Sequence, residues 1–163
     1  MTDDLMDVVM SVDGATVSAR VRARFLLSDF LREHAAAGGV HVACGHGVCG
    51  ACTIVVDGVA VRACLMLAVQ ADGCAVQTIA SLPVFEADDA PEIDGLTRLQ
   101  RAFRDHHALQ CGYCTPGLLV STAKFLAEFK SPNRAQILDH LNGHLCRCSG
   151  YANIIAAIES VLR

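Results

Sequence analysis

The segment from Ala43 to Cys52 reads Ala-Cys-Gly-His-Gly-Val-Cys-Gly-Ala-Cys, and we expect it to decide the fold. Together with a later cysteine it has the spacing C-x4-C-x2-C-x11-C. The pattern C-x4-C-x2-C followed by a more distant cysteine is the spacing of plant-type [2Fe–2S] proteins. The expected metal ligands of this first quartet are Cys44, Cys49, Cys52 and Cys64.

Three glycines in this loop suit a bound anionic cluster. A cluster with bridging sulfides carries negative charge, which is costly to bury without partners. Gly45, Gly47 and Gly50 allow the backbone to curl tightly, so we expect their N–H groups to point at the cluster. A structural zinc ion is the alternative. Zinc knuckles, however, usually take their ligands from two short C-x2-C-like units, which this loop does not contain.

A second quartet follows, with the spacing C-x2-C, a long gap and C-x-C. Its expected ligands are Cys111, Cys114, Cys146 and Cys148. Cys114 precedes a predicted helix, and the dipole and free N–H groups of a helix N-terminus stabilise a thiolate or an anionic cluster. C-x2-C alone would indicate a thioredoxin-like redox motif, but the second pair argues against it. Arg147 either screens cluster charge or forms a surface ion pair.

Composition and charge narrow the class of protein. The chain has 163 residues, 53% of them hydrophobic, and a formal net charge of −4, so we expect a packed core and no nucleic-acid partner. Aromatic residues make up 5% and there is no Trp, so a base-stacking platform is not expected. No apolar run approaches transmembrane length and the N-terminus is acidic, so we expect no membrane insertion and no secretory signal. Nine cysteines then indicate a reducing, cytoplasmic location.

Hydrophobic patterning predicts an α+β fold in the first half, residues 1–82. Residues 5–22 alternate around Asp-Gly, the pattern of a β-hairpin, and residues 53–62 repeat it around a second Asp-Gly. Between them we expect a helix that begins at Ser28 and ends at Gly38-Gly39. Residues 74–79 could form one more strand. The result is a small mixed sheet with one helix across it.

The second half, residues 96–163, is predicted to be helical, after an acidic, proline-containing linker at 83–95. We expect helices over residues 96–107 and 116–129, a third from Ser131-Pro132 to Gly143, and a fourth over residues 151–162. The cysteine pairs of the second quartet then fall in two loops between helices, where four sulfurs can meet.

The remaining polar residues give no catalytic set, so no catalytic residue is expected in this chain. Cys74 stands outside both quartets and is expected to be a buried small hydrophobic residue. The histidines share no ligand spacing, and we expect surface or helix-capping roles for them. They are His34, His41, His46, His106, His107, His140 and His144.

The two motifs, in this order, resemble those of the small iron–sulfur subunits of the molybdenum hydroxylases, the group of xanthine oxidase and aerobic carbon monoxide dehydrogenase. The resemblance covers nearly the whole chain. Besides the first quartet it rests on Gln110-Cys-Gly-Tyr-Cys-Thr-Pro-Gly117 and Leu145-Cys-Arg-Cys-Ser-Gly-Tyr151. One departure is His144, where the family often has Asn, so we expect different local hydrogen bonds there.

The resemblance implies a β-grasp, ferredoxin-like N-terminal domain and an all-α, four-helix C-terminal domain, each with one [2Fe–2S] cluster. It also implies a large subunit with molybdopterin and a medium subunit with FAD, in a heterotrimer or a dimer of heterotrimers. Electrons would pass from molybdenum to the helical-domain cluster, then to the ferredoxin-like cluster and to FAD. Gln110 would contact the pterin, with the 111–114 loop nearest the large subunit.

Two other functions stay open at this point. One is a free-standing two-cluster ferredoxin, and the other is a zinc-stapled binding module without a redox role. Residues 43–55 contain no Lys, Arg, Asp or Glu, which favours a covered interface over the charged face of a mobile carrier. The resemblance leaves the substrate open among aldehydes, N-heterocycles, aromatic acyl thioesters and carbon monoxide.

Overall fold

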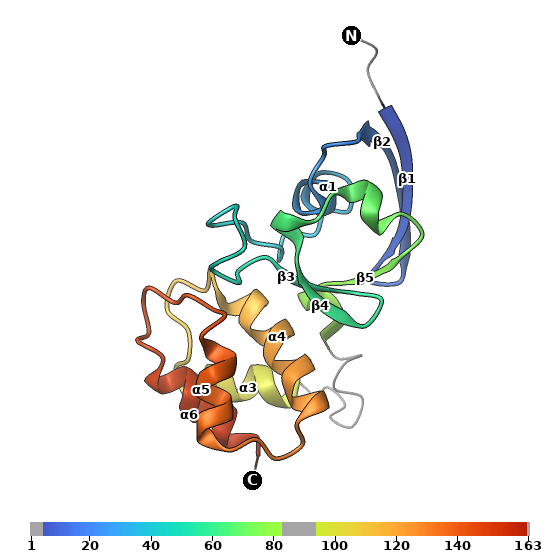
Figure 1. Ribbon diagram of the computed structural model, residues 1–163. Helices are drawn as coiled ribbons and strands as arrows, with labels where there is room; N and C mark the ends of the chain where they lie inside the picture. Colours follow the sequence, from blue (N-terminus) through green and yellow to red (C-terminus); the bar gives the residue numbers. More distant parts are fainter. Residues whose placement is uncertain (1–4, 83–93, 163) are drawn as a thin grey trace.

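A five-stranded mixed sheet forms the first half of the chain, and helices form the second (Figure 1). The computed structural model describes residues 5–82 and 94–162. The strand order is β2-β1-β5-β3-β4, with β1 and β5 parallel and the other neighbours antiparallel. The strands are β1 (Leu5–Val12), β2 (Ala15–Arg22), β3 (Thr53–Val56), β4 (Val59–Arg62) and β5 (Ala75–Gln77).

Both predicted hairpins are confirmed, with their turns at the predicted Asp-Gly pairs. Asp13 and Gly14 have φ of 50° and 86°, and Asp57 and Gly58 have φ of 46° and 83°. Two consecutive left-handed residues match the right-handed twist of the flanking strands, which is why Asp-Gly is favoured there. The carboxylate of Asp13 also accepts hydrogen bonds from the N–H and hydroxyl of Thr78, at 2.7 and 2.6 Å. These bonds tie the first hairpin turn to the segment that directly follows β5.

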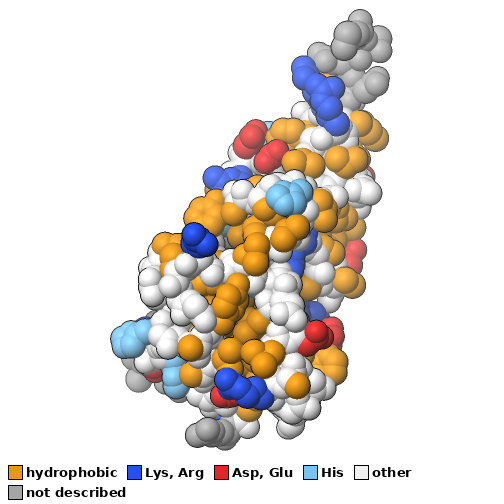
Figure 2. All heavy atoms as spheres, turned by 60° about the vertical axis from the view of Figure 1, so that its left-hand side comes forward, with side chains coloured by type: hydrophobic (Ala, Val, Ile, Leu, Met, Phe, Trp, Pro, Cys, Tyr) orange, Lys and Arg blue, Asp and Glu red, His pale blue; other side chains and the backbone are white. Residues whose placement is uncertain are grey.

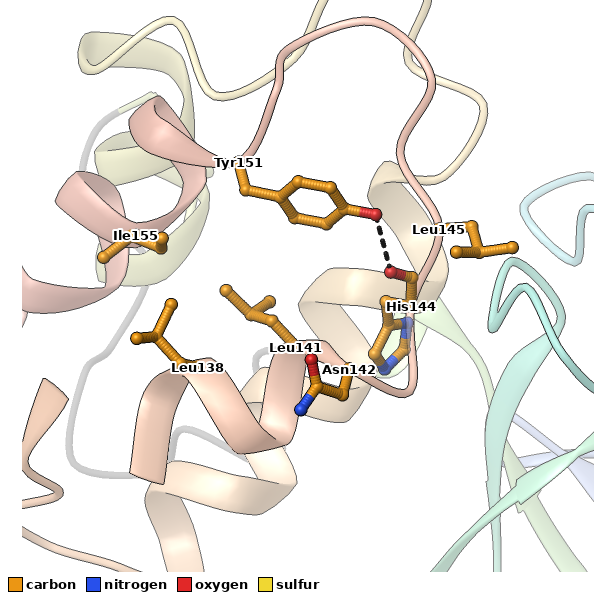
Figure 3. Close-up of a pocket in the computed structure, with 7 residues that line it drawn as sticks. All are labelled: Leu138, Leu141, Asn142, His144, Leu145, Tyr151 and Ile155. Atoms are coloured by element: carbon orange, nitrogen blue, oxygen red, sulfur yellow. Dashed lines mark hydrogen bonds between the residues drawn. The ribbon is translucent and has the colours of Figure 1, made fainter. Parts of the chain in front are cut away.

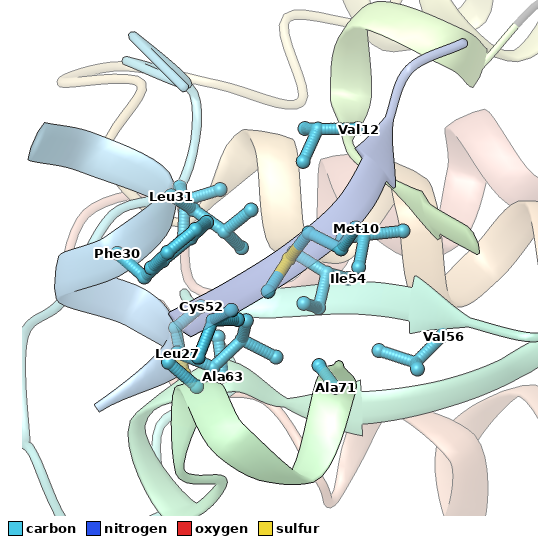
Figure 4. Close-up of a cluster of buried hydrophobic side chains, with 14 of the residues drawn as sticks. Met10, Val12, Leu27, Phe30, Leu31, Cys52, Ile54, Val56, Ala63 and Ala71 are labelled. Carbon is cyan, nitrogen blue, oxygen red and sulfur yellow. The ribbon is translucent and has the colours of Figure 1, made fainter. Parts of the chain in front are cut away.

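The core of the first half lies between the sheet and helix α1 (Leu27–Glu33), as Figure 4 shows. Phe30 and Leu31 of α1 are fully buried, and they face Met10 of β1 and Ile54 of β3. Each such side chain contributes about 1.5–3 kcal/mol through its burial. The helix begins one residue before the predicted Ser28 and ends well before the glycines. Ala36, with φ of 51°, takes the backbone out of the helical region first.

Over residues 94–162 the structure has four α-helices, and their apolar faces form a separate core. Phe103, Leu118, Ile137, Ile154 and Ile158 are fully buried in it. Leu82 and Ile79, at the end of the first half, pack against the same core. The helices are α3 (Arg98–Asp105), α4 (Thr115–Glu128), α5 (Arg134–Leu141) and α6 (Ala152–Ser160).

The predicted start of the third helix, at Ser131-Pro132, is wrong. Helix α5 begins at Arg134 with Asn133 as its N-cap. The Asn133 carboxamide accepts from the N–H of Gln136 at 3.0 Å, and the Gln136 side chain accepts from the N–H of Asn133 at 2.9 Å. This reciprocal capping box satisfies two free donors at once, which Ser131 could not do with Arg134 three residues on. At the other end α5 stops at Leu141 with Asn142 as its C-cap, so Gly143 takes the predicted C′ position just past the helix.

Short 3-10 turns at Ala63–Leu65 (η1) and Ala68–Ala71 (η2) lie between β4 and β5, and another at Ile79–Ser81 (η3) follows β5. Most of the predicted linker, residues 83–93, lies outside the described residues. Among the helices that the structure describes, none combines the length and the apolar character needed to cross a bilayer.

The two halves meet where helix α4 packs against strand β3. Gly117, in the first turn of α4, lies so close to the backbone of Gly50 and Ala51 that a Cβ atom would overlap their carbonyl oxygens. Arg62 of β4 reaches across as well. It donates one hydrogen bond to the Thr53 hydroxyl at 2.5 Å and another to the Gly143 carbonyl at 2.7 Å. The cysteine loops therefore lie at the junction of the halves.

Candidate metal centres

The second hairpin brings the fourth cysteine of the first quartet back to the other three. Thr53 pairs with Arg62 in the antiparallel register of β3 and β4, so the residues just outside this pair also meet. The N–H of Ala63 donates to the carbonyl of Cys52 at 3.2 Å. Cys64, the next residue, then lies beside Cys52, and both are buried. Cys44 and Cys49 come from the loop that precedes β3.

Backbone N–H groups surround the sulfur of Cys44. The N–H of Cys49 and that of His46, the latter at 3.5 Å, donate to it and lower the pKa of the thiol to about 6. Gly45, Gly47 and Gly50 have φ of 68°, 83° and 75°, a left-handed conformation that lets the loop curl around the sulfur. The predicted tight loop is confirmed, and it favours the thiolate form that a metal ligand requires.

Burial has the opposite effect at Cys64. Its surroundings, and next the neighbouring Cys52 thiol, raise the pKa of Cys64 to about 11. Two thiols that share buried space cannot both ionise without a cation to compensate them. A metal centre between the sulfurs would supply that cation, so the site fits a thiolate-bound metal group.

The second quartet lies between the helices as predicted. Cys111 and Cys114 belong to the α3–α4 loop, and Cys146 and Cys148 to the α5–α6 loop. The sulfurs of Cys148 and Cys111 are 3.5 Å apart. Cys114 is the N-cap residue of α4, as predicted, and burial followed by the Cys146 thiol raises its pKa to about 12. Cys114 therefore also needs a compensating cation to ionise.

Ser149 supports the sulfur of Cys146. Its hydroxyl lies 3.1 Å from that sulfur, and its N–H donates to it at 3.4 Å. Burial would raise the pKa of Cys146, but the hydrogen bonds from Ser149 outweigh burial and lower it. The α5–α6 loop therefore stabilises a thiolate in the same way as the first loop.

In both quartets the sulfurs contact one another as pairs. Within the described residues, no three His, Cys, Asp or Glu side chains converge as the ligands of one metal ion would. The paired thiols are Cys44 with Cys49, Cys52 with Cys64, Cys111 with Cys148, and Cys114 with Cys146. A [2Fe–2S] cluster takes two protein ligands at each of its two irons, whereas a structural zinc ion takes four at one point. Two pairs per quartet therefore fit a dinuclear cluster better than zinc.

A direct backbone hydrogen bond joins the two cysteine loops. The N–H of Leu145 donates to the carbonyl of Cys49 at 2.9 Å. A second connection lies at His41, whose ring stacks on Tyr113 with centroids 4.6 Å apart. The hydroxyl of Tyr113 donates to the carbonyl of Val42 at 2.9 Å. The segment that holds the first quartet thus contacts both loops that hold the second quartet.

Two other predicted residues lie apart from these contacts. Gln110 is exposed at the start of the α3–α4 loop, next to Cys111. Cys74 is only partly buried, at the edge of the first core, and its thiol lies 3.9 Å from the carbonyl oxygen of Asp72. Both cysteine quartets are complete without Cys74.

Sequence reasoning missed His144, which is neither a surface nor a capping residue. Its side chain is 2% exposed, and burial, followed by the charge of Arg62, lowers its pKa to about 3, so the ring is neutral. It borders a cavity of about 330 Å³ between α5, α6 and their loop (Figure 3). The signal in the sequence was its position two residues before Cys146.

The fold and the paired thiols define an iron–sulfur protein with two separate sites. Comparison with protein families agrees: a 2Fe-2S iron-sulfur cluster binding domain matches residues 10–76, and a [2Fe-2S] binding domain matches residues 86–159. The first half therefore has a ferredoxin-like α+β fold.

Known proteins narrow the class further. The chain is 47% identical to caffeine dehydrogenase subunit gamma of Pseudomonas sp. (strain CBB1), over 94% of this chain and 89% of the relative. It is 43% identical to the nicotine 6-hydroxylase small subunit of Paenarthrobacter nicotinovorans, over 95% and 88%. The crystal structure of quinoline 2-oxidoreductase from Pseudomonas putida 86 matches with a TM-score of 0.86 and 41% identity, over 98% of this chain and 93% of that one. The chain belongs to the family of small iron–sulfur subunits of molybdenum hydroxylases.

Proposed function

We propose that this chain is the electron-transfer subunit of a molybdenum-containing hydroxylase. It relays single electrons from the molybdopterin site of a large subunit, through two [2Fe–2S] clusters, to an FAD subunit. The observation that carries this proposal is the pair of cysteine quartets joined by the Leu145–Cys49 hydrogen bond, because a relay needs two adjacent carriers. Bound clusters would supply the one-electron chemistry, and the chain holds and separates them.

The proposed ligands of the first cluster are Cys44, Cys49, Cys52 and Cys64, and those of the second are Cys111, Cys114, Cys146 and Cys148. The close pairs support an assignment by iron. Cys44 and Cys49 would share one iron, and Cys52 and Cys64 the other. The N–H groups of the glycine loop would then donate toward the cluster sulfurs.

Each cluster has its own domain in this proposal. Residues 1–82 form a β-grasp, ferredoxin-like domain, residues 83–95 a linker, and residues 96–163 a four-helix domain. Two separate hydrophobic cores support the division. The burial of Leu82 in the helical core ties the two domains together at the linker.

An apolar face supports the proposal that partner subunits cover the cysteine loops. Val48, Leu65 and Leu145 are 54%, 62% and 54% exposed beside the two quartets. Figure 2 shows hydrophobic side chains gathered along this face, with most charged side chains nearer its margins. Exposed apolar patches of this kind mark protein interfaces, whose centres are poor in charge. A free carrier would instead need a charged, hydrophilic face around its cluster.

The partners follow from the family. A large molybdopterin subunit and a medium FAD subunit would assemble with this chain in a heterotrimer or a dimer of heterotrimers. Gln110, exposed beside Cys111, would contact the pterin, which places the helical domain nearest the large subunit. Thiolate ligands in both domains support a reducing, cytoplasmic location.

We further propose that the complex acts on an N-heterocycle. Three relatives above 40% identity are named for caffeine, nicotine and quinoline, which are all nitrogen heterocycles. Aldehyde oxidoreductases match at lower identity, 37% for the Escherichia coli subunit. Turnover of quinoline or nicotinate, with benzaldehyde inert, is the expected result for the purified complex. Preference for the aldehyde would contradict this substrate class.

Metal analysis and co-purification test the main proposal. We expect about four irons and four acid-labile sulfides per chain, the content of two [2Fe–2S] clusters. A tag on this chain should also bring down molybdenum- and flavin-containing subunits from native cells. Stoichiometric zinc without iron would refute the redox function. Full iron content without any such partner would instead favour the free-standing ferredoxin.

A further inference from the structure

His144 is held at its backbone by the helical half of the molecule. Its N–H donates to the carbonyl of Leu141 at 2.9 Å, and its carbonyl accepts from the hydroxyl of Tyr151 at 3.0 Å, the contact drawn in Figure 3. The same hydroxyl accepts from the N–H of Cys146 at 2.9 Å. The main chain that leads into the second quartet is therefore fixed at His144.

The imidazole of His144 extends from this anchor to the other half. Its Nε2 is 2.8 Å from the hydroxyl of Ser121 in helix α4. Its Nδ1 edge occupies the space in which a Cβ atom at residue 50 would lie, so the ring packs directly on Gly50 of the first cysteine loop. One side chain thus contacts α4 and the loop of the first quartet while its backbone belongs to the loop of the second.

The residue next to His144 makes the hydrogen bond between the two loops. Because Leu145 N–H donates to Cys49 O at 2.9 Å, any rotation or shift of residue 144 moves this bond as well. We propose that His144 is a positioning residue that sets the distance and orientation between the two metal sites. The proposal rests on the function proposed above, since it needs clusters in both quartets.

The shape of imidazole explains why a smaller side chain cannot do the same. Its two nitrogens lie at different edges of a rigid ring, so one meets Ser121 while the other side lies against Gly50. Asparagine ends earlier and presents its donor and acceptor on a single amide group. A variant with Asn would keep one contact and leave a space at the other.

The test is EPR spectroscopy of the reduced full-length chain, in its complex with both clusters loaded. Two reduced clusters split each other's EPR signals by a dipolar coupling. This coupling falls with the cube of the distance between the clusters and also depends on their relative orientation. We expect His144→Asn and His144→Ala to change this splitting while the iron content stays at the wild-type level. Hydrogen exchange of peptides over residues 43–52 and 143–148 should become faster in the same variants.

His140 supplies a matched control. Its ring contacts the same hydroxyl groups, with Nε2 3.4 Å from those of Ser121 and Thr122, and it stacks on Phe125. The ring of His140 lies near that of His144, with centroids 5.7 Å apart, but the atoms nearest to a Cβ at residue 50 belong to His144 and Gly143. His140→Asn should therefore lower Tm and change the splitting less than His144→Asn. Ser121→Ala keeps the histidine and removes its hydrogen bond, so it should change the splitting less than His144→Ala.

The possible results distinguish a failure of this inference from a failure of the proposed electron-transfer function. An unchanged splitting in both His144 variants, with only a lower Tm, would show that His144 merely packs and would overturn the inference. An equal change in His140→Asn would overturn it too, because a general loosening would then explain the effect. Absence of any cluster signal in the wild type would refute the proposed function itself.

Discussion

The cysteine sulfurs differ in their surroundings even within one quartet. Cys44 receives backbone N–H groups, which lower the pKa of its thiol to about 6, while burial raises that of Cys114 to about 12. The first loop therefore favours the thiolate of Cys44, whereas Cys114 needs a compensating cation beside it to ionise.

Replacing Cys114 by Ser should remove the helical-domain cluster and leave the other. The hydroxyl is a poor ligand for iron, and Cys114 lies partly buried against the Cys146 thiol. We expect about half of the iron and one of two EPR signals. Cys74→Ser, outside both quartets, should keep both signals. Two unchanged signals in Cys114→Ser would refute the ligand assignment.

Gly50 is constrained twice, by its backbone and by its neighbour. Its φ is 75°, and a Cβ atom there would overlap the His144 ring. Gly58 has a similar φ of 83° with open space around it. Urea unfolding should therefore show Gly50→Ala less stable than Gly58→Ala by about 1–3 kcal/mol, the cost of overpacking. Equal losses in the two variants would mean that backbone strain alone matters at residue 50.

Helix α4 is the element that organises the junction. Its N-cap is a proposed ligand, its first turn touches the first cysteine loop through Gly117, and Ser121 one turn later contacts His144. Helix α5 packs beside it through His140, whose ring stacks on Phe125 with centroids 4.4 Å apart. The buried imidazole of His144 and the partly buried imidazole of His140 thus both contact α4.

The contact between α4 and α5 predicts a pH-dependent stability. Burial, followed by the charge of Arg62, lowers the pKa of His140 to about 4. The unfolded chain binds a proton on this residue near pH 6.5, so the free energy of unfolding should fall as pH drops from about 6.5 to about 4, by at most about 3 kcal/mol. Urea unfolding at several pH values should give a flatter profile for His140→Gln. Parallel profiles would contradict the assignment.

At the scale of the whole molecule, two hydrophobic cores are joined by few polar contacts. Arg62 makes one of them, to the Gly143 carbonyl at 2.7 Å. The relative placement of the domains, and with it the spacing of the proposed clusters, depends on these contacts and on the packing of α4 against β3. A relay requires such rigidity, because electron transfer slows steeply as carriers move apart.

Removing Arg62 should loosen this junction. Arg62→Met leaves the Gly143 carbonyl without its donor, which costs about 1–3 kcal/mol for a buried group. We expect a lower Tm and a broader thermal transition by circular dichroism. The exposed ion pair of Arg134 with Glu159 provides the control, since Arg134→Met removes a surface pair worth at most about 1 kcal/mol. A similar loss in both variants would rule out a special role for Arg62.

The predictions that the structure and the comparisons confirm depend on residues that are close together in the sequence. The Asp-Gly hairpins, the tight glycine loop and the N-cap position of Cys114 depend on neighbours, so local patterns specify them. The family could be identified because its cysteine spacings are local motifs. The start of α5 was predicted wrongly, since Ser131 and Asn133 are both good caps and only the partner Gln136 separates them.

Contacts between distant residues were decided by the tertiary structure. The strand order, which places β5 between β1 and β3, depends on pairing that no local pattern specifies. The pairing of the thiols and the place of His144 between Ser121 and Gly50 arise only when the two halves pack. The spacing of the cysteines along the chain therefore predicts which kind of metal group this protein can bind. Packing sets the distance between its two sites, because that distance is a property of the interface.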